Sequence, residues 1–234
     1  MKSLQFWLNY VDFRAFSGTW VRLSCARAAV FSGVLFASAA VAQAGTQAGA
    51  IAYFDAAFNG DCRPYAETVG LLEDEGGPMP RRYEFTYEAS WASAGDPPEQ
   101  AVLFEFFCDA GAYNVRTVFL RDRGDYFEPV SFARPSVAVE NETEDYDSPV
   151  RSVTVTGYGA SLSVTNGRFD PETRRLTAHA YWRGLGDAYD EAVWIFRDDG
   201  FVLERFEVDA DYDGEVDPQL RLDFSGQEPG AAPN

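Results

Sequence analysis

Hydrophobic and polar residues alternate along the chain from residue 82 onward, and a period of two is typical of β-strands with one buried face. In the stretch RYEFTYEASW (82–91), one face of an extended strand would carry Tyr83, Phe85, Tyr87, Ala89 and Trp91. The opposite face would be polar. The stretch therefore predicts a half-buried strand.

Short strands of similar character follow at regular spacing. They are expected at 101–107, 115–120, 130–139, 152–157, 176–182, 192–196, 201–208 and 220–224. Between them stand residues that favour hairpin turns: Asn166-Gly167, Asp170-Pro171, Asp198-Asp199-Gly200 and Asp213-Gly214. Many short strands with almost no helix predict an all-β fold, either an antiparallel sandwich or an open barrel.

The segments around these strands complete the predicted organisation. AIAYFDAAFNGDCRPY (50–65) predicts a short N-terminal helix that ends at Asn59-Gly60, and EDEGGPMP (73–80) predicts an exposed loop. Residues 226–234 predict a disordered tail. The chain has 234 residues, 46% of them hydrophobic and 15% aromatic, which suits one core better than two. We therefore expect a single β-rich domain at 45–225.

The first 44 residues have the features of a secretory signal peptide. Basic residues precede an apolar run, AAVFSGVLFASAAVAQA (28–44), which contains two small-x-small cleavage candidates. A membrane anchor is the alternative, but the run is short and rich in alanine and serine, and we expect cleavage. This interpretation predicts a periplasmic or secreted protein.

Charge and cysteine content refine this picture. Without residues 1–44 the chain keeps 15 of its 19 basic and 36 of its 37 acidic residues, and its net charge changes from −18 to −21. Such a chain repels nucleic acid and favours cations or basic proteins as partners, although solubility alone would also explain the charge. The two cysteines that remain, Cys62 and Cys108, predict a disulfide in an oxidising compartment, with two free thiols as the alternative.

The stretch DADYDGEVD (209–217) is the candidate metal site. Alternate carboxylates around a glycine can converge on one hard cation such as Ca²⁺. The pattern resembles calcium loops of integrin-type propeller repeats, which would make Asp209, Asp211, Asp213 and Asp217 side-chain ligands and Glu215 a backbone-carbonyl ligand. An EF-hand is rejected because Leu220 stands at the twelfth position. The alternative is a solvated acidic turn. Bound calcium would have a Kd near 10⁻⁴ to 10⁻³ M, typical of extracellular modules.

Other chemistries find less support in the residues. His179 is the single histidine, and nothing around it in the sequence has the character of a catalytic nucleophile, which favours a structural role in a strand. The second acidic run, ENETEDYD (140–147), lacks a regular ligand spacing and is interpreted as a solvated loop. Paired carboxylates for glycoside hydrolysis stay open among so many acids.

Two stretches, CDAGAYN (108–114) and YWRGLGDAYDEAVWIFRDDGFVLERFEVD (181–209), resemble an exported bacterial family known as domain of unknown function family 1176. The resemblance covers roughly the last 130 of the 234 residues. It implies a periplasmic β-rich protein without a recorded activity, and it carries over no catalytic residue. Family members have a cysteine directly after R-G-L-G-D, where this chain has Ala188, so their second disulfide is absent here. A cation in the acidic loop would hold the same hairpin instead.

The motif residues also have a direct physical interpretation as turns. Arg183, Gly184, Gly186 and Asp187 would form a turn in which both glycines take a positive φ and Arg183 pairs with Asp187 or a neighbouring carboxylate. Gly111, Tyr113 and Asn114 would fix a bend in the same way.

The sequence thus predicts an exported, acidic binding or structural module that is stabilised by calcium. The alternatives are a periplasmic hydrolase that acts on envelope glycan through carboxylates and an accessory subunit for a basic enzyme. An enzyme should have a cleft with converging carboxylates of perturbed pKa.

Overall fold

The computed structural model describes residues 45–71, 79–145 and 148–226. The predicted signal peptide and nearly all of the predicted tail lie outside these residues, as do most of the predicted loop at 73–80 and the end of the acidic run at 140–147. No helix in the described part of the chain is both long and apolar enough to span a membrane.

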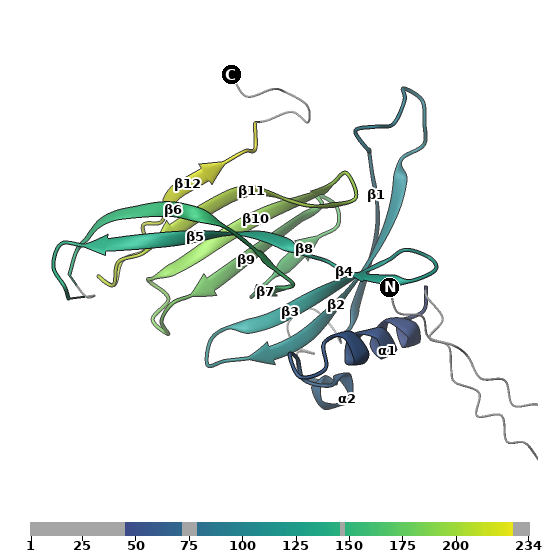
Figure 1. The fold of residues 1–234 in the computed structure, drawn as a ribbon, viewed down its shortest axis with the longest axis horizontal. Helices are drawn as coiled ribbons and strands as arrows, with labels where there is room; N and C mark the ends of the chain where they lie inside the picture. The colour runs from purple at the N-terminus through teal and green to yellow at the C-terminus, as the bar shows by residue number, and fades with distance from the viewer. Residues whose placement is uncertain (1–44, 72–78, 146–147, 227–234) are drawn as a thin grey trace, which may run out of the picture. The chain divides into compact units, whose positions relative to one another are not determined.

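Two five-stranded antiparallel sheets and a long hairpin form the fold (Figure 1). The first sheet contains β1 (Arg81–Tyr87), β2 (Glu99–Ala110), β3 (Val115–Asp122) and β4 (Phe127–Pro129), with β7 (Ser163–Thr165) also on β3. The second sheet has the order β12 (Gln219–Asp223), β11 (Gly200–Asp209), β10 (Tyr189–Arg197), β9 (Arg175–Tyr181) and β8 (Arg168–Asp170). The hairpin pairs β5 (Phe132–Asn141) with β6 (Val150–Ser161).

The helices are short and lie at the N-terminal end of the described chain. α1 spans Gln47–Ala57 and α2 spans Tyr65–Thr68. Thr46 caps α1 because its hydroxyl accepts a hydrogen bond from the Gly49 backbone N–H at 3.0 Å. The predicted all-β class with a short N-terminal helical segment is confirmed.

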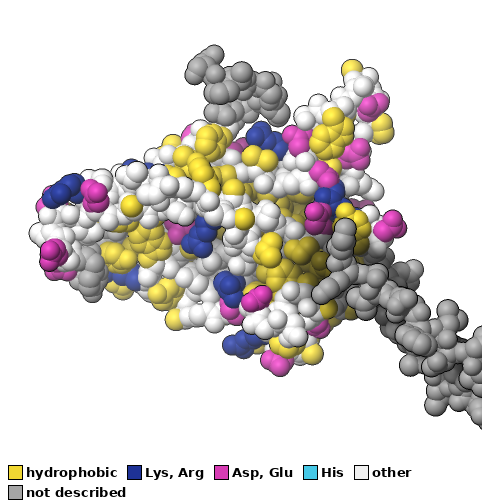
Figure 2. Space-filling view, in the orientation of Figure 1, with side chains coloured by type: hydrophobic (Ala, Val, Ile, Leu, Met, Phe, Trp, Pro, Cys, Tyr) yellow, Lys and Arg dark blue, Asp and Glu magenta, His cyan; other side chains and the backbone are white. Residues whose placement is uncertain are grey.

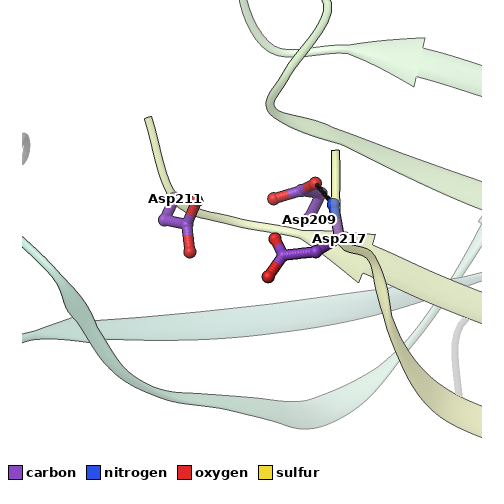
Figure 3. Close-up of side chains that lie close together, drawn as sticks. All are labelled: Asp209, Asp211 and Asp217. Carbon is purple, nitrogen blue, oxygen red and sulfur yellow. Dashed lines mark hydrogen bonds between the residues drawn. The ribbon is translucent and has the colours of Figure 1, made fainter. Parts of the chain in front are cut away.

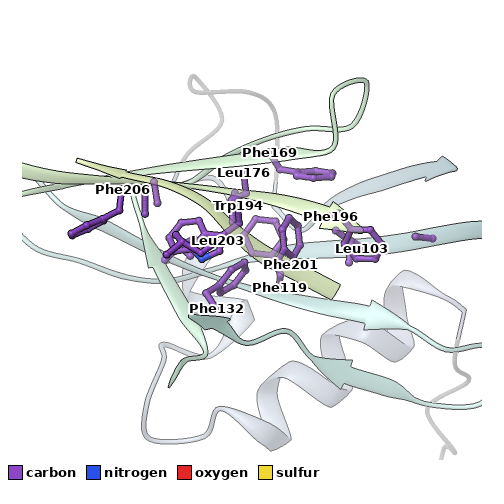
Figure 4. Packing of buried hydrophobic residues seen from close by; sticks show 14 of the residues in the cluster. Leu103, Phe119, Phe132, Phe169, Leu176, Trp194, Phe196, Phe201, Leu203 and Phe206 are labelled. Atoms are coloured by element: carbon purple, nitrogen blue, oxygen red, sulfur yellow. The ribbon is translucent and has the colours of Figure 1, made fainter. Parts of the chain in front are cut away.

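The main hydrophobic core fills the space between the two sheets and the β5–β6 hairpin (Figure 4). Leu103 and Phe119 come from the first sheet, Trp194 and Phe201 from the second, and Phe132 from the hairpin, and all five are buried. The four aromatic rings of this set meet in tilted or edge-to-face pairs, with Phe132 and Trp194 centroids 5.4 Å apart. Alternation along the strands thus places one face of each sheet in a shared core.

A second core covers the opposite face of the first sheet. Phe54 of α1 stacks on Phe106 of β2 with centroids 4.5 Å apart, and Phe104 and Leu120 are buried beside them. Strand β2 is consequently buried on both faces, which explains why its sequence is a continuous apolar run rather than an alternating one.

A network of arginine side chains connects the first sheet to the second. Asp198 and Asp199 form the β10–β11 turn with positive φ angles of 48° and 74°. Arg121 and Arg123 of β3 and its following loop both form ion pairs with Asp199. The Tyr87 hydroxyl also donates a hydrogen bond to the Asp199 carboxylate at 2.7 Å. The turn of one sheet is therefore fixed to the strands of the other.

Two local predictions were wrong, and three short strands were missed. The strand expected at 82–91 ends at Tyr87, and Trp91 is 61% exposed because the chain turns there, with the Ala92 N–H bonded to the Ala89 carbonyl. Asn166-Gly167 does not close a hairpin: β7 before it pairs with β3, whereas β8 after it pairs with β9. The three-residue strands β4, β7 and β8 were not predicted.

The predicted Cys62–Cys108 disulfide is present, with Cα atoms 4.4 Å apart. It ties the segment after α1 to the buried strand β2, and the Arg63 N–H donates to the Cys108 carbonyl at 2.9 Å beside it. The bond therefore anchors the helical layer on the first sheet.

Replacing both cysteines, as Cys62→Ala with Cys108→Ala, should lower the free energy of unfolding by as much as about 4 kcal/mol, because the unfolded chain would no longer be constrained by the loop. Urea unfolding of both proteins measures the change. A reducing agent should destabilise the natural protein and leave the double variant unaffected. Equal unfolding midpoints for the two oxidised proteins would contradict the expectation.

Candidate functional site

The acidic loop joins β11 to β12 and begins inside the fold. Asp209 is the last residue of β11 and is 2% exposed, whereas Asp217 is exposed just before β12. Gly214 has a φ of +92°, a conformation that favours glycine and allows the loop to reverse. The Asp217 backbone N–H donates to Asp209 Oδ2 at 2.8 Å, which closes the loop.

Three of the five predicted ligands come together here (Figure 3). One carboxylate oxygen from each of Asp209, Asp211 and Asp217 lies within 4.8 Å of the other two. Oxygen atoms that bind one Ca²⁺ at about 2.4 Å are at most about 4.8 Å apart. The arrangement therefore has the dimensions of a shared cation site.

The other two predicted ligands, Asp213 and Glu215, are not part of this cluster. Asp213 Oδ1 accepts a hydrogen bond from the Glu215 N–H at 2.8 Å within the turn, and Glu215 itself faces solvent. Asp213 still lies close enough for its negative charge to raise the pKa of Asp211. The turn is thus held partly by its own carboxylate, as an acidic Asx turn would be.

The electrostatics of the loop favour a cation. Burial raises the pKa of Asp209 and of Asp211 above the usual value, and the charges of the neighbouring loop carboxylates raise both further. The buried atom Asp211 Oδ1 has no hydrogen-bond partner among the described residues. A bound cation would supply that partner and offset the repulsion.

The R-G-L-G-D turn (183–187) contacts the acidic loop through the side chains of Arg183 and Asp187. Arg183 forms an ion pair with the buried Asp187 and its guanidinium lies 4.8 Å from the Tyr212 ring centroid. Asp187 Oδ2 also accepts a hydrogen bond from the Gly214 N–H at 3.0 Å. The predicted pairing of Arg183 with Asp187 is confirmed. The turn therefore fixes the point at which the acidic loop reverses.

One expectation for this turn was wrong. Gly186 has a φ of +81°, as predicted, but Gly184 has no positive φ. A Cβ atom on Gly184 would lie 3.4 Å from the ring of Tyr113, so the position is close-packed instead. The glycine leaves space for an aromatic neighbour from the C-D-A-G-A-Y-N segment.

The Asn114 side chain connects the β2–β3 turn to β9. Its Nδ2 donates to the Tyr181 carbonyl at 2.8 Å, and its Oδ1 accepts from the Tyr181 N–H at 3.1 Å. Asn166 donates to the same Oδ1 at 3.0 Å. The side-chain amides of Asn114 and Asn166 thus connect the first sheet to β9 of the second sheet, with bonds to the Tyr181 backbone like those between paired strands.

His179 lies on β9 in a strand environment. Its Nδ1 is 3.2 Å from Glu191 Oε2, and its ring stacks on Tyr189 with centroids 4.1 Å apart. Burial and the nearby acids Glu207, Asp209 and Glu191 raise the pKa of Tyr189 to about 12. These contacts suit a residue that packs and pairs within the sheet.

Sequence reasoning missed a buried carboxyl group, Glu105. It lies on β2 with 0% exposure, directly opposite Arg81 of β1. Its Oε2 accepts hydrogen bonds from the Tyr83 hydroxyl at 2.7 Å and from Arg81 Nη1 at 3.2 Å. The available signal was one charged residue in the apolar run AVLFEFFC (101–108), because a buried acid is rare unless it is paired or functional.

Burial dominates the chemistry of this group. It raises the pKa of Glu105, while the Tyr83 hydroxyl and the Arg81 charge act in the opposite direction. Thr117 lies near enough to favour the carboxylate, yet neither Thr117 Oγ1 nor Glu105 Oε1 makes a hydrogen bond of ordinary geometry with a described residue. Glu105 lines a cavity of about 920 Å³.

Comparison of the chain with protein-family models, with curated proteins and with solved structures found no match. The resemblance to domain of unknown function family 1176 therefore stays a prediction. The described residues therefore define the class of the molecule: an antiparallel β protein with two five-stranded sheets and a hairpin, a disulfide and a cluster of three aspartates.

The raised pKa of Glu105 predicts a pH-dependent stability. Because the folded protein holds this proton more tightly than the unfolded chain, the contribution is complete below the ordinary pKa of 4.5 and is lost as the pH rises through the folded pKa. From pH 4.5 to 8, the natural protein should lose stability relative to Glu105→Gln by at most about 1.4 kcal/mol per pH unit. Urea unfolding across this range measures the difference, and parallel profiles would refute it.

Proposed function

We propose that this protein is an exported β-rich binding or structural module, and that its loop at 209–217 binds Ca²⁺. The convergence of Asp209, Asp211 and Asp217 carries the proposal. Export is supported by the apolar run at 28–44 and by the Cys62–Cys108 disulfide, since disulfides persist in oxidising compartments.

The lack of a counter-charge in the loop supports a cation from solution. The two other buried acids of the described chain both have arginine partners: Arg81 pairs with Glu105 and Arg183 with Asp187. Among the ion pairs of residues 45–71, 79–145 and 148–226, none includes Asp209, Asp211 or Asp217. A divalent ion would balance these charges with the oxygen ligands that it prefers.

The charge of the whole chain supports the same class of partner. The net charge is −18. On the face shown in Figure 2, the described basic side chains are scattered among acidic ones and gather in no patch. Nucleic acid is therefore a poor partner, and a divalent cation or a basic protein is a better one.

The alternative, a hydrolase of envelope glycan, is less well supported. Glycosidases usually place two carboxylic acids roughly 5 to 9.5 Å apart across the scissile bond. The described residues that line the cavity at Glu105 include no second carboxylic acid. One buried carboxyl group in a cavity suits binding better than this two-acid chemistry.

Excess calcium should raise the thermal unfolding temperature above that measured in chelator. Ligand at a hundred times its Kd contributes about 2.7 kcal/mol, which is roughly 5 to 10 °C for a domain of this size. Asp211→Asn should abolish the shift because it removes one ligand charge from the cluster. Differential scanning calorimetry of the purified protein measures both.

The matched control is Asp125→Asn, which removes the same charge at an exposed position outside the loop and should keep the full shift. Coincident unfolding curves for the natural protein with chelator and with calcium at ten times the weakest expected Kd, about 10 mM, would exclude a calcium site. An equal shift in the Asp211→Asn protein would place the ion elsewhere.

A further inference from the structure

The cavity of about 920 Å³ borders the main core, because Phe169 of that core and Tyr83, which packs against it, are among the lining residues. Its lining comes from several segments that are distant in sequence: β1 contributes Arg81, β2 contributes Glu105, β3 contributes Thr117, and β8 contributes Arg168. Its volume is within the range of cavities that hold small ligands. It shares no lining residue with the acidic loop.

Aromatic rings form a large part of the lining. Tyr83 meets Phe169 edge to face with centroids 5.1 Å apart, and Tyr113 meets Tyr181 in the same way at 6.5 Å. Tyr113 is 43% exposed, so its ring is accessible at the cavity. Such rings provide apolar contact area with a polar edge, which suits ligands that have both C–H surface and hydroxyl groups.

Two buried polar atoms of lining residues, Glu105 Oε1 and Thr117 Oγ1, make no hydrogen bond of ordinary geometry with a described residue, although Thr117 lies near enough to favour the Glu105 carboxylate. Leaving such groups unpaired is costly in a folded protein, so a site that retains them calls for an explanation. A hydroxyl group can both donate to a carboxylate oxygen and accept from a threonine hydroxyl. A small side-chain movement would bring ligand hydroxyl groups into contact with both atoms, which are buried in this structure, and would satisfy them.

The charge of the lining is opposite to that of the protein. It contains two arginines and one carboxylic acid, whereas the chain has 37 acidic and 19 basic residues. Arg81 neutralises Glu105 at 3.2 Å. Arg168 is exposed, and no ion pair of the described residues includes it. The cavity thus offers a guanidinium group to a ligand carboxylate.

We propose that this cavity binds a carboxylate-bearing carbohydrate of the uronic acid class, one or two rings in size. The hydroxyl groups contact Glu105 and Thr117, the ring packs on the tyrosines, and the carboxylate pairs with Arg168. This site is separate from the calcium loop, and either could exist without the other.

Isothermal titration of the purified protein with D-galacturonate and its disaccharide, against glucose and cellobiose as neutral probes, tests the proposal. We expect the acidic sugars to bind more tightly than the neutral ones by roughly threefold to tenfold, the effect of one added hydrogen-bonded contact. Arg168→Gln should remove this preference. Arg197→Gln, which removes the same charge outside the cavity lining, should preserve it.

Thr117→Val tests the proposed contact between the ligand and Thr117, which lines the cavity. The change is nearly isosteric and removes a hydroxyl that makes no hydrogen bond of ordinary geometry, so the thermal unfolding temperature should stay the same or rise. Binding of acidic and neutral sugars should both weaken by roughly threefold to tenfold. Three outcomes would overturn the proposal. They are the absence of binding heat with every sugar at 10 mM, equal affinity for acidic and neutral sugars, and binding that neither Arg168→Gln nor Thr117→Val changes.

Discussion

The burial of β2 on both faces is the constraint on which the rest of the structure depends. Leu103 faces the second sheet, whereas Phe104 and Phe106 face α1. A strand of this kind cannot lie on the surface of a two-layer sandwich, because one row of large side chains would be left in water. It requires a third layer. The helix α1 provides that layer, and the disulfide at Cys108 fixes the helical segment to the strand it covers.

The same constraint makes Glu105 exceptional. An acid at the centre of a doubly buried strand costs free energy through desolvation, and the partners Arg81 and Tyr83 offset only part of that cost because Oε1 has no hydrogen bond among the described residues. An apolar residue would suit a purely structural strand better. Departures of this kind from good packing are expected where a fold serves a function.

The parts of the fold that depend on local pattern could be predicted from the sequence. The long strands β2, β3, β10 and β11 were found because alternation or apolar runs mark them, and the Asp198-Asp199-Gly200 hairpin was found because its turn residues are specific. The pairing of strands that lie far apart in the sequence could not be predicted from local patterns of this kind. Asn166-Gly167 has the same local signal as a hairpin turn, but here Asn166 hydrogen-bonds to Asn114 and the two flanking strands pair in different sheets.

The two candidate sites differ in the same way. The loop at 209–217 could be found from spacing because all its carboxylates belong to one short segment, whereas the cavity at Glu105 is assembled from separate strands and has no signature in any one of them. The ion pairs distinguish the acidic loop from the other acidic turns of the fold. Arginine fixes the acidic turn at Asp199 through Arg121 and the turn at Asp187 through Arg183. The three clustered aspartates have no such partner in the described chain. Arginine thus balances the acids of these two turns, whereas a cation from solution would be needed to balance the three aspartates of the loop.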